Sequence, residues 1–179
     1  MKNKKIQTLV LTALLAALTC VATMVIQIPS PTGGFFNLGD CVVLLSAFLL
    51  GPIYGMAAAG IGSAFADILS GYFIYAPGTL VIKGLMALAA ALIYRSFTKR
   101  RSGFGSALAG AVVGGIAAEL IMVAGYFLYE LPMYGFGTCL TSALTTNLPQ
   151  AGVGLVAGVC LYVLLDRSKV TAKIAGGIA

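Results

Sequence analysis

The sequence predicts an all-α integral membrane protein, a bundle of six transmembrane helices with both termini in the cytoplasm. Of the 179 residues, 60% are hydrophobic and only 9% are charged, whereas soluble domains carry about 25% charged residues. The apolar residues form stretches close to the length of about 20 residues that a helix needs to cross a bilayer. Basic residues gather at the flanks of these stretches, which is typical of cytoplasmic loops.

Five apolar stretches follow one another, at residues 6–28, 41–69, 76–94, 104–129 and 137–165. The first is longer than the core of a signal peptide, about 7–15 residues, so we expect a retained helix. The second forms either one long tilted helix or two helices divided at Gly51-Pro52, because proline interrupts helical hydrogen bonding. The external connections are then expected at residues 29–39, 70–75 and 130–136.

The basic clusters decide between these alternatives. Two clusters flank the first three stretches, namely Lys2, Lys4 and Lys5 before them and Arg95, Lys99, Arg100 and Arg101 after them. Both belong on the cytoplasmic side, so the number of crossings between them must be even, which requires the division at Gly51-Pro52. A third group, Arg167, Lys169 and Lys173, also lies in the cytoplasm under this threading. The prediction is a single transmembrane substrate-binding domain over residues 1–179.

Four ionisable side chains lie within or at the edge of the apolar stretches: Asp40, Asp67, Lys83 and Glu119. A charge in hydrocarbon costs at least about 2.5–3.5 kcal/mol, so such residues mark a functional site by default. The threading places Asp40, Asp67 and Lys83 in the outer half of the membrane and Glu119 deeper. Asn147 and Gln150 share one helical face at a comparable depth. A plain salt bridge between Asp67 and Lys83 is the structural alternative.

Several function classes are excluded by what the sequence lacks. Histidine, the commonest ligand of catalytic zinc and the commonest general base, is absent. The chain contains no G-x-x-x-x-G-K-[ST] phosphate loop and no G-x-S-x-G or H-E-x-x-H motif, so neither ATP coupling nor a recognised hydrolytic scheme is supported. We therefore expect no enzyme activity, no metal site and no cofactor.

Several short segments carry a family resemblance: FNLGD at 36–40, GP at 51–52, GSAFAD at 62–67, YAP at 75–77, IKGLM at 82–86, MVAGY at 122–126 and NLPQ at 147–150. As a set they resemble the substrate-binding S components of energy-coupling factor (ECF) vitamin transporters. The resemblance covers residues 6–165 and is closest to the riboflavin, pyridoxine and hydroxymethylpyrimidine types.

This resemblance implies a six-helix subunit in a prokaryotic plasma membrane that binds a vitamin near the outer face, capped by the loop after the first helix. The expected substrate-binding residues are Asn37, Asp40, Asp67, Tyr75, Lys83, Glu119, Tyr126, Asn147 and Gln150. The implied partners are a transmembrane scaffold (T) subunit and two cytoplasmic ATPases, which hydrolyse ATP while the loaded subunit topples in the membrane. The small face at Ala13 and Ala17 is expected to dock on the scaffold.

The residues favour a substrate-capture subunit of an ATP-driven importer. Both charge signs, two amides and many tyrosines suit a small heteroaromatic compound with hydroxyl or amine groups. This favours a vitamin B6 form or the pyrimidine of thiamine, with riboflavin and pantothenate as further candidates. An autonomous ion- or proton-coupled carrier, with Asp67, Lys83 and Glu119 as a relay, is the alternative, and a structural membrane subunit is a third. The aromatic residues of the external connections form either an interfacial belt or a lid.

Overall fold

The computed structural model describes residues 2–100, 103–171 and 174. Within these residues the elements are α1 Lys2–Val25, β1 Ile28–Pro29, β2 Phe35–Phe36, α2 Gly39–Leu50, α3 Pro52–Leu69, α4 Ala76–Arg100, α5 Phe104–Ser142, the π-helix η1 Ala143–Asn147 and α6 Leu148–Arg167. The helical prediction is therefore confirmed, and the two short strands are an addition to it. They pair antiparallel and form a hairpin between α1 and α2.

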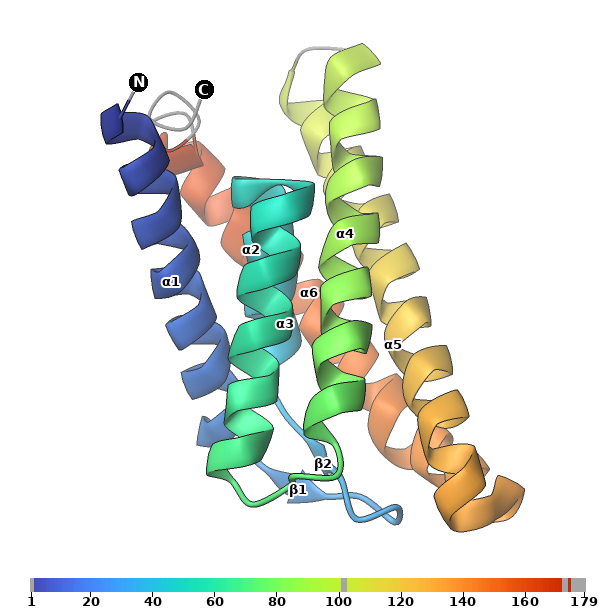
Figure 1. Ribbon diagram of the computed structural model, residues 1–179. Helices are drawn as coiled ribbons and strands as arrows, with labels where there is room; N and C mark the ends of the chain where they lie inside the picture. Colours follow the sequence, from blue (N-terminus) through green and yellow to red (C-terminus); the bar gives the residue numbers. More distant parts are fainter. Residues whose placement is uncertain (1, 101–102, 172–173, 175–179) are drawn as a thin grey trace.

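The helices lie side by side as a bundle (Figure 1). At its centre, α2 contacts each of the other five α-helices, and nearly all of its 12 residues are buried. On one side α4 packs against both α3 and α5, and on the other α1 packs against α3 and α2. A helix of 12 residues rises about 18 Å, well short of the roughly 30 Å hydrocarbon core. The hairpin lies at the end of the bundle where α2 begins (Figure 1).

The exterior of the bundle is apolar. Val10, Phe65 and Leu120 are each more than half exposed. Four helical stretches are long and apolar enough to cross a membrane, namely Lys4–Val25, Pro52–Leu69, Ala76–Arg100 and the merged Phe104–Arg167. Such long apolar helices with an apolar outer surface are stable when lipid covers them. The chain is a multi-pass α-helical membrane protein.

The predicted division at Gly51-Pro52 is present. α2 ends at Leu50 and α3 begins at Pro52, and Gly51 between them has a φ of 79°. This backbone conformation favours glycine, and proline suits the first helical position because its missing N–H has no helical partner there. The Arg95 guanidinium packs directly against Gly51, where an added Cβ would collide with it. The backbone conformation disfavours a larger residue at this position, whereas the flexible Arg95 side chain could move aside.

The expected connection at residues 130–136 is present but shorter than predicted. The segment α5 consists of two helices that meet at Gly135, where φ is 76° and ψ is 164°, and Pro132 lies in the first of them. Thr32 Oγ1 lies 2.9 Å from Glu130 Oε1 and 3.1 Å from Ser142 Oγ. Twelve residues of one continuous helix would separate the two by about 18 Å, so the chain turns back at Gly135. Proline is tolerated in membrane helices because neighbouring groups satisfy the freed carbonyl. The connection is thus a sharp break at Gly135 rather than a loop over the whole segment. As a consequence Glu130 is held on a helix rather than on a loop.

Basic residues lie at the end of the bundle opposite the hairpin. There α1 begins, α4 ends and α6 ends (Figure 1). The charges in this region are Lys4, Lys5, Lys99, Arg100 and Arg167. Of the basic residues used in the threading, Arg101 and Lys173 lie outside the described residues. The predicted clustering of positive charge is therefore present among the residues that the structure describes.

Candidate functional site

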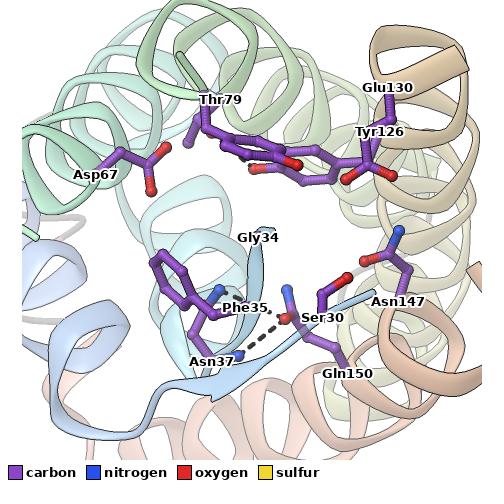
Figure 2. A pocket seen from close by; sticks show the side chains of 11 residues that line it. Ser30, Gly34, Phe35, Asn37, Asp67, Thr79, Tyr126, Glu130, Asn147 and Gln150 are labelled. Atoms are coloured by element: carbon purple, nitrogen blue, oxygen red, sulfur yellow. Dashed lines mark hydrogen bonds between the residues drawn. The ribbon is translucent and has the colours of Figure 1, made fainter. Parts of the chain in front are cut away.

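A polar pocket lies at the hairpin end of the bundle. Its lining comes from the hairpin segment, α3, α4, α5, η1 and α6: Ser30, Gly34, Phe35, Asn37, Asp67, Tyr75, Thr79, Tyr126, Glu130, Asn147 and Gln150. Figure 2 shows the labelled side chains converging from these elements. The free volume is about 30 Å³, room for roughly one or two water molecules. This free space is smaller than a ring compound, so the pocket must widen to admit one.

A buried ion pair supports the floor of the pocket. Lys83 Nζ on α4 pairs with Asp40 Oδ1 on α2, and both side chains are almost completely buried. The other oxygen, Asp40 Oδ2, accepts a hydrogen bond of 2.6 Å from Gln150 Nε2 on α6. Gln150 Oε1 accepts a bond of 2.9 Å from the backbone N–H of Asn37. Both Asp40 oxygens are therefore engaged, and the Gln150 amide is fixed in place.

The salt bridge considered between Asp67 and Lys83 is wrong. Lys83 pairs with Asp40, and Asp67 Oδ2 has no hydrogen-bond partner among the described residues. Asp67 lies on α3 and lines the pocket, whereas Asp40 lies behind the floor. The two acids thus have different roles: Asp40 neutralises the lysine, and Asp67 faces the cavity.

Glu119 lies close to Asp40, outside the pocket lining. It is 4% exposed, and neither carboxyl oxygen finds a hydrogen-bond partner in the part of the chain that the structure describes. Gly154 on α6 lies directly against both acids. A Cβ added at Gly154 would lie 2.7 Å from Asp40 Cβ and 2.9 Å from Glu119 Oε1. Contacts this short require glycine at the position. Glu119 is therefore a buried acid beneath the floor.

Aromatic rings form the walls of the pocket. The hydroxyls of Tyr126 and Thr79 lie 2.9 Å apart, and Lys83 Nζ lies 5.5 Å from the centroid of the Tyr126 ring, within the range of a cation–π contact. Phe35 and Tyr75 also line the pocket. The aromatic residues of the external connections do not all share one role: Phe35 and Tyr75 line the pocket, whereas Phe73 is 66% exposed. They serve partly as cover for the pocket and partly as outer surface.

The turn of the hairpin is bonded to α5 by hydroxyl groups. Thr32 Oγ1 donates to Glu130 Oε1 at 2.9 Å, and the hydroxyls of Ser30 and Ser142 lie 2.7 Å apart. Tyr75 donates its hydroxyl to the Thr32 carbonyl at 2.6 Å. Thr32 is fully buried by these contacts. Side chains from α5, together with Tyr75 just before α4, therefore hold the hairpin over the pocket.

Three buried atoms of the lining lack a hydrogen-bond partner among the residues described: Asp67 Oδ2, Glu130 Oε2 and Asn147 Nδ2. In Figure 2 the Asp67 carboxyl lies on one side of the pocket, with the Glu130 carboxyl and the Asn147 amide on the opposite side. Asn147 ends the π-helix η1, a wider turn that is frequent at functional sites. Buried polar atoms ordinarily have partners, so these atoms are candidate contacts for a polar ligand.

Six of the nine residues predicted to bind substrate line this pocket: Asn37, Asp67, Tyr75, Tyr126, Asn147 and Gln150. The other three, Asp40, Lys83 and Glu119, lie behind it. Five further lining residues are not predicted from the sequence: Ser30, Gly34, Phe35, Thr79 and Glu130. For Glu130 the available signal is an acid next to an apolar stretch. Thr79 gives no signal, because a threonine in an apolar helix usually bonds to its own backbone.

Comparison with known proteins gives matches over nearly the whole chain. Residues 3–167 match the family model of the ECF-type riboflavin transporter S component. An uncharacterized protein of Pyrococcus woesei is 38% identical over 149 residues, 82% of this chain and 94% of that protein. The thiamine precursor transporter HmpT of Lactococcus lactis subsp. cremoris is 28% identical over 170 residues, 94% of this chain and 93% of that protein.

Two solved structures share the fold. The S component of a bacterial ECF transporter superposes with a TM-score of 0.66 at 19% identity, covering 92% of this chain and 95% of that chain. The S-component for biotin from an ECF-type ABC transporter superposes with a TM-score of 0.69 at 17% identity, covering 94% of both chains. At these identities the likeness concerns the fold, a bundle of membrane helices.

Proposed function

Because the chain belongs to the family of ECF transporter S components, whose model it matches over residues 3–167, we propose that it is the substrate-capture subunit of an ATP-driven importer. S components are substrate-binding subunits for a vitamin or precursor and are not enzymes. The observation that carries the proposal is the small polar pocket with three buried atoms that lack a partner among the described residues. A purely structural subunit has no need of such a pocket.

The topology we propose is six crossings with both termini in the cytoplasm of a prokaryotic cell and the pocket at the outer face of the plasma membrane. The basic residues at the starts and ends of α1, α4 and α6 support this orientation, because cytoplasmic loops carry an excess of lysine and arginine. The short α2 is covered by its neighbours. Residues 1–179 act as one domain in this proposal.

The proposed substrate is a vitamin B6 form or the pyrimidine of thiamine. Aromatic walls and hydrogen-bonding groups on opposite sides suit a single polar ring. The similarity to a protein named as a thiamine precursor transporter supports the pyrimidine. Riboflavin and pantothenate remain further candidates. The cavity of about 30 Å³ favours small ligands, because a smaller ring needs less widening.

The proposed partners are a T subunit and two cytoplasmic ATPases. Support comes from an apolar groove of about 480 Å³ between α1 and α3, lined by Leu9, Thr12, Ala13, Ala16, Ala17, Cys20, Ala57, Ile61, Gly62, Phe65 and Leu69. Ala13 and Ala17 are exposed in it, and Gly62 lies against the Ala16 carbonyl. Small residues let helices approach closely, so the groove is suited to a helix of the scaffold.

Transport by proteoliposomes tests this function. With the chain alone we expect binding of substrate without accumulation, and with the T subunit, both ATPases and internal ATP we expect uptake. An autonomous carrier predicts uptake by the chain alone under an ion gradient. Accumulation of substrate under that condition would contradict the proposal.

A further inference from the structure

Resting on the function proposed above, we infer that the pocket selects a substrate without negative charge, a flat ring that presents hydrogen-bond donors at two opposite edges and an acceptor beside one of them. Phosphate esters and carboxylates are rejected. This selection follows from the charge of the lining, from the unpartnered atoms and from the shape of the walls.

The lining carries negative charge without a compensating cation. Asp67 and Glu130 are its acids, and none of the pocket residues that the structure describes is basic. Lys83 is engaged by Asp40 in the buried ion pair. Like charges repel strongly in a low-dielectric pocket where no counter-charge is present. A substrate that carries a phosphate or a carboxylate therefore meets two acids, whereas an amine gains from them.

The unpartnered atoms specify donors and an acceptor. Asp67 Oδ2 and Glu130 Oε2 are acceptors that lack a donor among the described residues, and Asn147 Nδ2 is a donor that lacks an acceptor. Thr32 Oγ1 already donates to the other Glu130 oxygen, which leaves Glu130 Oε2 for the ligand. Because Asp67 lies across the pocket from Glu130 and Asn147 (Figure 2), the complementary groups must lie on opposite edges of one small molecule.

The walls favour a flat ring between these groups. Phe35, Tyr75 and Tyr126 line the pocket, and their faces stack with a heteroaromatic ring. The aminopyrimidine alcohol of thiamine offers an amine and a hydroxymethyl group as donors, with ring nitrogens as acceptors, but its two donors lie on neighbouring ring carbons and reach one edge only. Pyridoxamine offers an aminomethyl group, two hydroxyls and one ring nitrogen. Pantothenate carries a carboxylate and has a flexible chain in place of a flat ring, so it meets neither the charge requirement nor the shape requirement.

Calorimetric titration of the full chain in detergent tests the inference. The ligands are the aminopyrimidine alcohol of thiamine, pyridoxamine and riboflavin, each beside its own phosphate ester, together with pantothenate. We expect saturable binding of a non-anionic compound and at least about 100-fold weaker binding of its ester, since each factor of ten in affinity corresponds to one 1.4 kcal/mol step of repulsion. Each ester differs from its partner by the phosphate, which adds both charge and bulk, and the charge-removing variants below separate the two effects.

Two variants test the assignment of the acids. Asp67→Asn and Glu130→Gln keep the size of the side chain and remove its charge, so each should reduce the discrimination against the ester by about tenfold. Asp166→Asn, near the end of α6 and away from the lining, is the matched control and should leave the discrimination unchanged. Unchanged discrimination in both pocket variants would overturn the assignment.

The possible failures are distinguishable. Binding of an ester or of pantothenate as tightly as the uncharged compounds overturns the inference and leaves the proposed function intact. Absence of saturable binding by all seven compounds contradicts the proposed function, and the inference falls with it. The comparison of ligands uses the unaltered chain, so it stands even where a variant does not fold.

Discussion

Gln150 Nε2 donates to Asp40 Oδ2 across 2.6 Å, and this contact joins the lining of the pocket to the ion pair beneath it. Gln150 comes from α6, Asp40 from α2, and Lys83, the partner of Asp40, from α4. A side chain held by groups from several helices loses little freedom when a ligand binds. The floor of the pocket is therefore preorganised by Asp40 and Lys83, which lie outside its lining.

The first prediction concerns Gln150. Gln150→Ala removes the donor to Asp40 and the acceptor for the Asn37 N–H, and an unpartnered buried group costs about 1–3 kcal/mol. We expect ligand affinity to fall at least about tenfold, as measured by calorimetry. Gln7→Ala, at an exposed glutamine of α1, is the matched control. Equal affinity in the two variants would show that the Gln150 contacts do not shape the site.

The second prediction concerns the ion pair. Lys83→Met leaves Asp40 as an uncompensated buried charge, and loss of one partner of a buried pair costs about 3–5 kcal/mol. We expect the Tm in detergent to fall by about 10 °C. Adding Asp40→Asn should restore much of the loss, because the unpaired charge is removed.

Lys99→Met, at an exposed lysine near the end of α4, is the control for the second prediction and should leave the Tm unchanged. A double variant no more stable than Lys83→Met would argue against a charge effect at Asp40.

The third prediction concerns the close passage of α6. In Gly154→Ala the new Cβ would lie 2.7 Å from Asp40 Cβ and 2.9 Å from Glu119 Oε1, so Asp40 must shift. We expect a lower Tm and weaker ligand binding, by about tenfold if the shift costs about 1.4 kcal/mol. Gly152→Ala on the same helix meets nothing within 4 Å and should behave as the unaltered chain. If both variants behave alike, the packing at Gly154 is not what positions Asp40.

The fourth prediction concerns docking of partners. Ala13→Trp or Ala17→Trp fills the α1–α3 groove and should abolish co-purification with the T subunit and ATPases while sparing ligand affinity. Ala124→Trp, at an exposed alanine of α5, controls for the added bulk on the lipid-facing surface. Normal recovery of the partners with both groove variants would place the docking surface elsewhere.

Features that depend on local chemistry could be predicted from the sequence. The break at Gly51-Pro52 follows from the backbone preferences of two adjacent residues, and the basic end follows from the flanks of apolar stretches. The turn between the fifth and sixth crossings also follows from local residues, since the break at Gly135 lies within the predicted segment 130–136. The length of that connection depends on the packing of the surrounding helices, which a single segment does not contain.

The pairing of Lys83 depends on how the helices are rotated about their axes. Asp40 and Asp67 both lie at a depth that Lys83 reaches, so depth along the membrane does not distinguish them. Packing of α4 against α2 directs Lys83 to Asp40 and leaves Asp67 facing the cavity. Glu130 enters the pocket for a similar reason, because the helix that ends at the Gly135 break fixes its direction.

Native mass spectrometry of the chain purified alone from vitamin-rich medium tests the central claim most directly. The account predicts one small, non-anionic ring compound bound per chain, with occupancy lost in Gln150→Ala and retained in Gln7→Ala. A chain that carries no small molecule even after incubation with the candidate vitamins, or one whose bound compound is a phosphate ester or a carboxylate, would contradict the account.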